Sequence, residues 1–539
     1  MRRKIMEIKF PDTQENTTIT QKVEFFIRMF VLAVGLFLLS RNLDSQFVGW
    51  REDNNALYSF FARNHIYYGL GYTKLFQTYG VTQAPPAKPQ RYLHHPPLLP
   101  LWAAIPMLVF GDHEWVVRSV PIAATLGSAW LLMVIIGRLQ SQALGVLAGL
   151  FYVMLPITAY FGRVLNHDSP VQFFSLLTLH GYLQWTGLYG NGYSRKTGAV
   201  YYVLAVALGT GTGWGATIMA GLIWIWHLCR IFRDRSLVRF LPILTVIPAV
   251  SLAAVIIHIL WGAQWDIGWL GTLFLSRTAG PAETTSWAEW LHLNRVYLAF
   301  NVSLFGIGAA VFYLAIIPAI LRYTASDSPF RQIVRDGTSV VPVLLTGLQG
   351  LIWVIVFRHQ SGMHAYWQYL ISPFVAAGMA AAALTVFILL SRYAPTAAIY
   401  VTILIILVPI PFFARSLDIL YKIKPHYENV ESAAAVFKKL AQIIPFRIPV
   451  MTSEEFTLKP GSGEIVPQVT YYANRPLVYT TDINEIEANQ QNSAAYILRA
   501  TNDPNMYQLA QKLGEKHKLV TVEGGYMIFL LNQPEKHAK

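Results

Sequence analysis

Apolar runs alternate with short polar loops along most of the chain. A helix needs about 20 predominantly apolar residues to cross the hydrocarbon core of a bilayer. About eleven runs approach that length, namely residues 23–40, 114–137, 141–161, 169–188, 198–213, 214–229, 239–262, 296–321, 338–357, 367–390 and 395–413. The pattern predicts an all-α polytopic membrane bundle.

Basic residues lie in alternate loops between these runs. They are Arg2, Arg3, Lys4, Arg138, Arg195, Lys196, Arg230, Arg233, Arg235, Arg239, Arg322, Arg331, Arg335 and Arg392. Lys and Arg concentrate in the cytoplasmic loops of membrane proteins. We therefore expect a cytoplasmic tail at 1–22 and a transmembrane domain at 23–414. After an odd number of spans, the C-terminus lies outside.

Two connections on the predicted outer side are long. Residues 41–113 contain two amphipathic stretches, 54–66 and 97–109, each too short or too polar to span. We expect both to lie along the membrane surface as interfacial helices. Residues 263–295 are rich in tryptophan, as expected of a segment at the level of the lipid headgroups.

Hydropathy falls after Arg415, and residues 415–539 predict a small extracytoplasmic α/β domain. Helical periodicity occupies 428–443 and 504–517. Strand candidates lie at 448–452, 477–479, 495–498, 518–522 and 526–531.

Composition agrees with a membrane protein, since 54% of the residues are hydrophobic, only 13% are charged, and the mean hydropathy is +0.40. The net charge of +13 is spread between apolar runs, which argues against nucleic-acid binding. The single cysteine, Cys229, excludes a disulfide framework and favours a bacterial inner membrane. The polar N-terminus and Arg41 after the first apolar run indicate a retained anchor rather than a cleaved signal peptide.

Three clusters of ionisable residues fall on the predicted outer side, although unpaired charge near lipid is expensive. The first is Glu52 and Asp53, directly after the first span. Adjacent carboxylates suit a general base or a divalent cation. Alternatively, they form the N-cap and first-turn acid of the helix at 54–66.

The second cluster is Arg91, His94 and His95, directly before Pro96 and Pro97. Imidazole binds phosphate when it is protonated and metal when it is neutral. Alternatively, the histidines are interfacial polar residues and the prolines start a helix.

The third cluster combines two helix junctions. Its members are Arg163, His167 and Asp168 at one junction and His359, His364 and Tyr366 at the other. Asp168 lies two residues before Pro170, so a structural N-cap role is an alternative to a catalytic one.

The ordered set of motifs in the first third of the chain resembles the opening of the lipid-carrier-dependent glycosyltransferases. This group includes the protein O-mannosyltransferases and the lipid A aminoarabinose transferases, within the glycosyltransferase-C superfamily. The resemblance rests on Asp53, Ala62-Arg63-Asn64, Tyr68-Gly69-Leu70, His95-Pro96-Pro97-Leu98, Phe110-Gly111, Glu114-Trp115 and Arg118.

The resemblance implies an inverting transfer of a sugar from a polyprenyl-phosphate carrier at the extracytoplasmic membrane face. The family's acidic residue corresponds to Asp53, with Glu52 as second choice, and its donor-phosphate residue corresponds to His95. The aminoarabinose transferases usually have lysine there, preceded by glutamate, whereas this chain has His95 preceded by His94. They also have an arginine three residues after the aspartate, where this chain has Ala56. Arg63 and Arg91 are the candidates to replace that arginine.

The chemistry of such a transfer assigns roles to the clusters. Asp53 would accept the proton of the attacking hydroxyl. The departing phosphate needs neutralisation rather than a general acid. Basic residues of the second and third clusters are the candidates for this, and so is a divalent cation held by Glu52, Asp53, His94 and His95.

Other function classes remain open at this stage. A transporter or lipid flippase is the main alternative, although it predicts polar residues at mid-bilayer and inverted repeats that the sequence lacks. A receptor or assembly scaffold is the third possibility. The sequence leaves open whether the acceptor is a lipid, a glycan or a protein.

Overall fold

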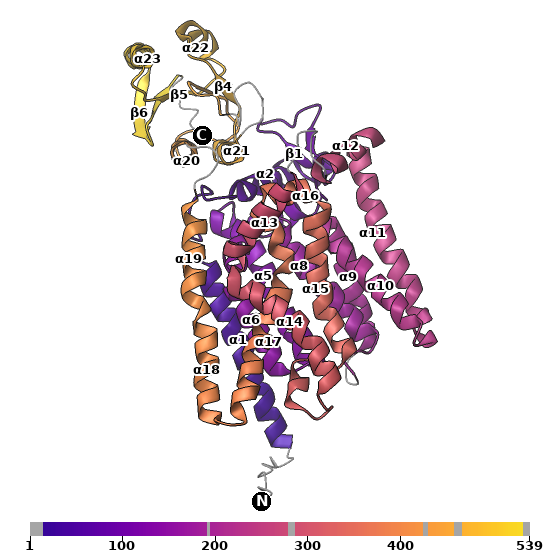
Figure 1. Cartoon of the computed structure of the whole chain (residues 1–539). Helices are drawn as coiled ribbons and strands as arrows, with labels where there is room; N and C mark the ends of the chain where they lie inside the picture. The colour runs from indigo at the N-terminus through magenta and orange to yellow at the C-terminus, as the bar shows by residue number, and fades with distance from the viewer. Residues whose placement is uncertain (1–13, 191–193, 279–285, 424–428, 457–465, 532–539) are drawn as a thin grey trace, which may run out of the picture.

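The computed structural model describes residues 14–190, 194–278, 286–423, 429–456 and 466–531. These residues form a long bundle of helices with a smaller module at one end (Figure 1). The bundle helices are α1 (Gln14–Leu39), α5 (Glu114–Leu139), α6 (Gln142–Met154), α7 (Pro156–Phe161), α8 (Asp168–Trp185), α9 (Arg195–Thr212), α10 (Gly215–Ile231), η1 (Arg235–Phe240), α11 (Leu241–Gly262), α14 (Ser303–Tyr323), η2 (Pro329–Gln332), α15 (Gly337–Val356), α17 (Ser372–Ser391), α18 (Pro395–Leu407) and α19 (Pro409–Lys422).

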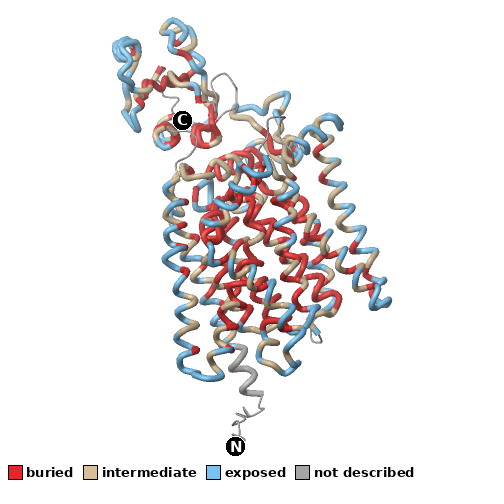
Figure 2. Tube along the Cα trace, in the orientation of Figure 1, coloured by how far each residue is buried: buried red, intermediate tan, exposed pale blue. Residues whose placement is uncertain are grey.

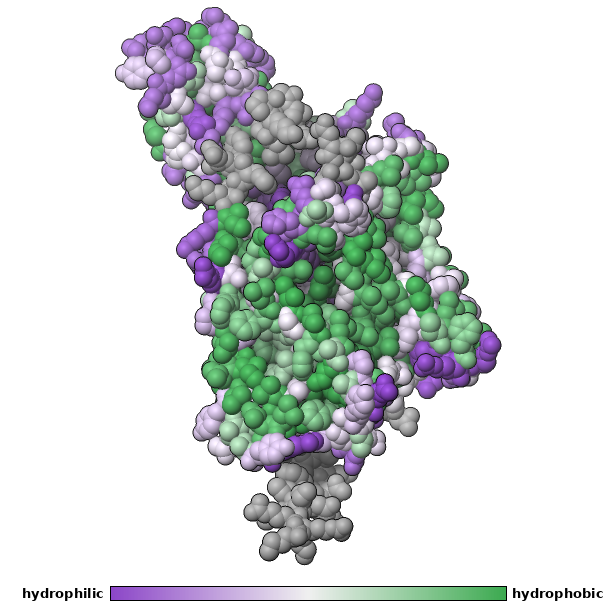
Figure 3. All heavy atoms as spheres, in the orientation of Figure 1, coloured by the Kyte–Doolittle hydropathy of each residue, from purple (hydrophilic) through white to green (hydrophobic). Residues whose placement is uncertain are grey.

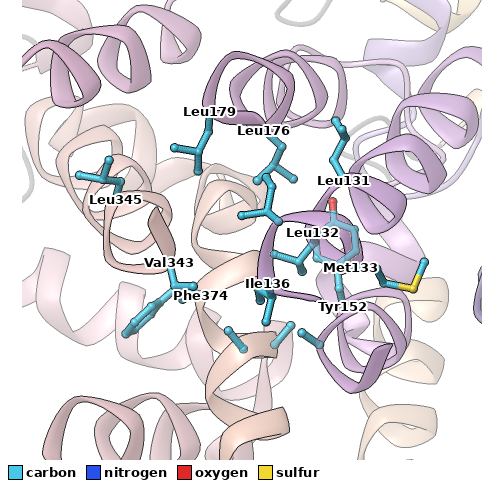
Figure 4. Packing of buried hydrophobic residues seen from close by; sticks show 14 of the residues in the cluster. Leu131, Leu132, Met133, Ile136, Tyr152, Leu176, Leu179, Val343, Leu345 and Phe374 are labelled. Carbon is cyan, nitrogen blue, oxygen red and sulfur yellow. The ribbon is translucent and has the colours of Figure 1, made fainter. Parts of the chain in front are cut away.

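The interior of the bundle is apolar and closely packed. Figure 2 shows buried positions concentrated in its middle, and Figure 4 shows side chains of α5, α6, α8, α15 and α17 meeting there. The alanine-rich α17 lies against α14 so closely that a Cβ on Gly378 would come within 2.7 Å of the carbonyl oxygen of Ala309. Small residues permit such close approach between membrane helices.

The outer surface of the bundle is also apolar. Within the described residues, six helical stretches are long and apolar enough to span a bilayer: Glu114–Leu139, Arg235–Gly262, Ser303–Tyr323, Gly337–Val356, Ala365–Ser391 and Pro395–Lys422. Three of these have only 17% of their most apolar window buried in the protein. In Figure 3, hydrophobic side chains cover the middle of the visible face of the bundle, and polar side chains gather toward its two ends. Such a surface is stable only in lipid, so the chain is a multi-pass membrane protein.

Several predicted spans are not continuous helices. Run 141–161 is divided between α6 and α7, because Pro156 has no N–H to continue the ladder. Run 296–321 is divided at Ser303, whose φ of 63° is incompatible with a right-handed helix. Run 395–413 lies in one helical stretch in which Val408 alone separates α18 from α19, and α19 continues to Lys422, beyond the expected domain boundary. The total of about eleven spans and their orientation stay predictions.

Shorter elements cover the end of the bundle next to the module (Figure 1). They are α2 (Asp53–Tyr68), α3 (Leu70–Thr73), β1 (Gln77–Tyr79), β2 (Gln90–Tyr92), α4 (Leu99–Phe110), α12 (Ile267–Thr278), α13 (Trp287–Asn301), α16 (Arg358–Met363) and η3 (Ala365–Ile371). The helices expected at 54–66 and 97–109 are α2 and α4, which pack on each other. Helix α2 ends at Gly69, whose φ of 78° suits glycine.

The C-terminal module, residues 429–531, contains a five-stranded sheet in the order β4-β3-β5-β7-β6. Strands β4, β3 and β5 are parallel, whereas β7 and β6 continue the sheet antiparallel. Its elements are α20 (Val430–Ala441), β3 (Val450–Thr452), α21 (Pro467–Ala473), β4 (Leu477–Tyr479), α22 (Ile483–Asn489), β5 (Ala495–Arg499), α23 (Pro504–Lys516), β6 (Lys518–Glu523) and β7 (Tyr526–Leu530). These strands coincide with the predicted segments.

The module shares a core with the first outer loop. Phe60 and Phe61 of α2 and Leu99 of α4 belong to the same buried apolar cluster as Phe437 of α20 and Val469 of α21. The module is therefore packed onto the elements that lead into the candidate site.

Candidate functional site

A polar cavity of about 210 Å³ lies at the end of the bundle next to the module. Asp53 and Tyr58 reach it from α2, and Asp168 reaches it from α8. Other lining residues come from loops, α12, α15, α16 and η3, and they include Arg51, His95, His167, Arg277, Trp353, His364, Tyr366 and Trp367. Members of all three sequence clusters therefore meet in one cavity.

Asp53 and Asp168 occupy equivalent places on their helices. Each is the first residue of its helix and acidic in the first turn, where the N-terminal dipole stabilises negative charge. The N-cap residues are Glu52 and His167, and neither caps its helix with a side-chain hydrogen bond. The structural alternative is therefore correct in position for the first cluster, with Glu52 at the N-cap and Asp53 as the first-turn acid, whereas Asp168 lies one residue after the N-cap. Asp53 and Asp168 both line the cavity as well.

Glu52 lies outside the cavity in a buried ion cluster. Its Oε1 accepts hydrogen bonds from Arg118 at 2.9 Å and from Arg163 at 2.8 Å. Its Oε2 accepts the N–H of Gly49 at 3.1 Å. Burial by itself would raise the pKa of Glu52, but the two guanidinium groups outweigh it and hold the pKa below its ordinary value. Glu52 therefore anchors the start of α2, and Asp53 rather than Glu52 lines the polar cavity.

Burial favours the neutral form of two cavity histidines, His95 and His167. His95 stacks on His167 with ring centroids 4.1 Å apart, and the Tyr58 hydroxyl lies 3.4 Å from His167 Nδ1. Burial lowers the pKa of His167 to about 3 and, together with His167, holds the pKa of His95 well below its usual range. Neutral imidazoles offer hydrogen bonds but no charge. The expected role of His94 and His95 at the donor phosphate stays a prediction.

Arg277 brings a positive charge to the polar cavity, as Arg51 also does. It lies in the last turn of α12, where a cation is favoured by the helix dipole. One guanidinium nitrogen lies 2.8 Å from Nδ1 of His94. Burial, reinforced by Arg277, lowers the pKa of His94 to about 4. Because Arg277 can only donate, His94 accepts at Nδ1 and carries its proton on Nε2.

Two further cavities adjoin the polar one. An apolar cavity of about 630 Å³ runs between α10, α11, α12 and α15, lined by residues such as Ile218, Ile256, Leu270, Phe274 and Ile352. A third cavity of about 500 Å³ is lined by His94, Trp269, Ser276, His359 and His364, among others. Arg277 is the residue that lines all three of these cavities.

Other sequence candidates lie elsewhere. Arg63 pairs with Asp112 and donates to the carbonyl of Tyr471 at 2.7 Å, which places it against the module. Arg91 packs its guanidinium over Phe76, 4.2 Å from the ring centroid. Arg163 binds Glu52. These three arginines line none of the three cavities, whereas Arg51 and Arg277 line the polar one. Arg277 was not among the residues expected from the sequence.

The expected metal ligands do not gather. Throughout the described part of the chain, no group of three or more His, Cys, Asp or Glu side chains is arranged to hold a metal ion. Glu52 is bound to two arginines, and His94 is bonded to Arg277. Asp53 and His95 remain as two members of the polar cavity, fewer than the three protein ligands of a typical catalytic zinc site.

Comparison with known proteins gives a family match over part of the chain and a fold. Residues 94–261 match the family described as dolichyl-phosphate-mannose-protein mannosyltransferase. ArnT from Cupriavidus metallidurans bound to undecaprenyl phosphate superposes with a TM-score of 0.61 at 13% identity, covering 94% of this chain and 98% of that one. Archaeoglobus fulgidus oligosaccharyltransferase tethered with an acceptor peptide superposes with a TM-score of 0.54 at 13% identity, covering 95% and 74%. Curated protein sequences gave no match.

These similarities confirm the resemblance predicted from the motifs. At 13% identity the structural matches establish a shared fold, which by itself does not fix activity. The chain shares the fold of these two structures, and the family match covers residues 94–261.

Proposed function

We propose that this protein transfers a sugar from a polyprenyl-phosphate carrier to an acceptor hydroxyl or phosphate at the extracytoplasmic face of a bacterial inner membrane. The observation that carries the proposal is the meeting of three cavities at Arg277. One cavity is polar and contains a carboxylate, and another is apolar and suits an isoprenoid tail. The family match and the carrier bound to ArnT support the same donor class.

The donor's phosphate would lie against Arg277. A guanidinium binds phosphate with charge-assisted hydrogen bonds and neutralises charge as it develops on the leaving group. The neutral His94 offers its Nε2–H beside the arginine. The carrier's tail would occupy the apolar cavity, lined by Ile218, Leu270 and Ile352 among others, and the sugar would extend toward Asp53.

The reaction proceeds by displacement at the anomeric carbon. Asp53 accepts the proton of the attacking hydroxyl while the oxygen of that hydroxyl forms the new bond to the anomeric carbon. The bond between the anomeric carbon and the phosphate oxygen breaks, and the phosphate leaves with both electrons. Attack opposite the leaving group inverts the anomeric configuration. His359 and His364 line the third cavity, which offers the acceptor a separate entrance.

Activity of Asp53→Asn tests the proposal. Purified protein in lipid nanodiscs is assayed with a panel of polyprenyl-phosphate sugars and membrane-lipid acceptors, and products are identified by mass spectrometry. Loss of a general base typically lowers the rate about 10²- to 10⁴-fold. Asn has nearly the same volume, so the variant should unfold at the wild-type temperature.

The matched control is Asp266→Asn, which alters an exposed carboxylate before α12 that lines none of the three cavities. It should keep wild-type activity. Wild-type activity of Asp53→Asn would exclude Asp53 as the base. Movement of the intact carrier-linked sugar across the bilayer without glycosidic transfer would instead identify a flippase.

A further inference from the structure

The C-terminal module is attached to the first outer loop by two adjacent tyrosines of α21. The hydroxyl of Tyr471 donates to Asp112 at 2.7 Å. The hydroxyl of Tyr472 donates to Glu114 at 3.2 Å and accepts the backbone N–H of Phe47 at 2.8 Å. The sugar transfer described above uses neither tyrosine.

A buried chain of contacts leads from Tyr472 to the start of α2. The ring of Phe47 lies under the guanidinium of Arg118, 4.8 Å from carbon to centroid. Arg118 donates to Glu52 at 2.9 Å, and Glu52 directly precedes Asp53. Phe47 and Arg118 are fully buried and Glu52 is 3% exposed, so water does not loosen any link.

The same arginine also fixes the backbone of segment 43–52. It donates to the carbonyl of Leu43 at 2.7 Å and to that of Ser45 at 2.6 Å. Segment 43–52 is therefore held at its beginning and its end by Arg118 and at Phe47 by the module. A displacement at Phe47 has no flexible linker to absorb it before it reaches α2.

We propose that Tyr472 and Phe47 are positioning residues, through which the C-terminal module sets the orientation of Asp53 in the polar cavity. The inference rests on the proposed role of Asp53 as the base. Misplacing a reacting group by about 1 Å lowers the rate on the order of 10²-fold. The module therefore contributes to the chemical step although none of its described residues, 429–456 and 466–531, lines the polar cavity.

Tyr472→Phe tests this with the full-length chain in nanodiscs. It removes one hydroxyl and both of its hydrogen bonds but keeps the ring in the shared core. Sites able to bind the carrier are counted by titration with undecaprenyl phosphate. We expect kcat per competent site to fall about 10-fold. KM for the donor should change less than about 2-fold, because the variant leaves the apolar cavity and Arg277 unchanged.

A double-mutant cycle and a matched control make the test specific. Phe47→Leu interrupts the same chain, so the effects of Tyr472→Phe and Phe47→Leu should not multiply in the double variant. Tyr507→Phe, which changes a 73% exposed tyrosine of α23, should behave as wild type.

Three results would overturn the inference. The first is a wild-type kcat per competent site in Tyr472→Phe. The second is a loss of activity in Tyr472→Phe that comes only from fewer competent sites. The third is a double variant in which the rate losses of Tyr472→Phe and Phe47→Leu multiply. The first two leave the module a purely structural part. Failure of the proposed function is distinguishable, because it would show either as full transfer activity in Asp53→Asn or as no transfer activity in the wild type.

Discussion

Glu52→Gln should destabilise the folded chain strongly, because it leaves Arg163 buried without a counter-charge. Glu52 receives hydrogen bonds from Arg163 at 2.8 Å and from Arg118 at 2.9 Å. Arg118 keeps its bonds to the carbonyls of Leu43 and Ser45. Within the described chain, the Arg163 side chain donates a hydrogen bond to Glu52 from Nη2. Its Nε and Nη1 are buried without a hydrogen-bond partner in the described residues.

The magnitude follows from this asymmetry. Removing one member of a buried ion pair costs about 3–5 kcal/mol, because the remaining charge stays in a poorly solvated place. Arg163 is 2% exposed, so we expect an unfolding free energy lower by roughly 3 kcal/mol or more. Replacing both partners, as in Glu52→Gln with Arg163→Met, should restore a large part of the loss.

Unfolding in mixed micelles, followed by tryptophan fluorescence, measures these values. The matched control is Asp418→Asn, since Asp418 also binds a cation, Lys422, but both side chains are exposed, at 50% and 74%, and they pair within one helix. This change should alter stability by less than about 1 kcal/mol. A loss below about 1 kcal/mol for Glu52→Gln, or a double variant as unstable as the single one, would refute the reasoning.

Three further predictions follow from the site. Arg277→Gln should raise KM for the donor about 10- to 100-fold, with Arg277→Lys intermediate, in steady-state transfer assays; an unchanged KM would remove Arg277 from the phosphate site. Ile218→Gln should raise KM for long-chain donors but not for water-soluble short-chain donors, since only a long tail fills the apolar cavity; equal effects would contradict that assignment. The unfolding free energy should fall as pH drops from 6.5 toward 4, because the pKa of His94 is about 4 in the folded chain and 6.5 when unfolded, so that the unfolded state binds the proton first. In His94→Gln the unfolding free energy should depend less on pH over this range. The same pH dependence in the variant and the wild type would contradict the prediction.

Hydropathy alone was sufficient to predict a membrane bundle, because lipid requires long apolar helices wherever the chain crosses it. It did not predict every break. Pro156 and Pro409 are visible in the sequence as helix breakers, whereas the left-handed backbone of Ser303 depends on surrounding packing.

The candidate site was predicted only where local sequence determines position. Asp53 and His95 were found because each starts or precedes a recognisable helix. The role of Glu52 was hidden, since its partners Arg118 and Arg163 lie 66 and 111 residues further along the chain. Arg277, 183 residues from His94, belongs to a segment that the sequence analysis had noted only for its tryptophans.

The position of Arg277 at the junction of the three cavities has a consequence for turnover. Under the proposed function, the spent carrier keeps both its tail and its phosphate after the sugar has left. It therefore competes with loaded carrier for the same apolar cavity and for the guanidinium of Arg277. The ratio of loaded to spent carrier in the bilayer, rather than the total amount of either, would then govern how fast the protein works.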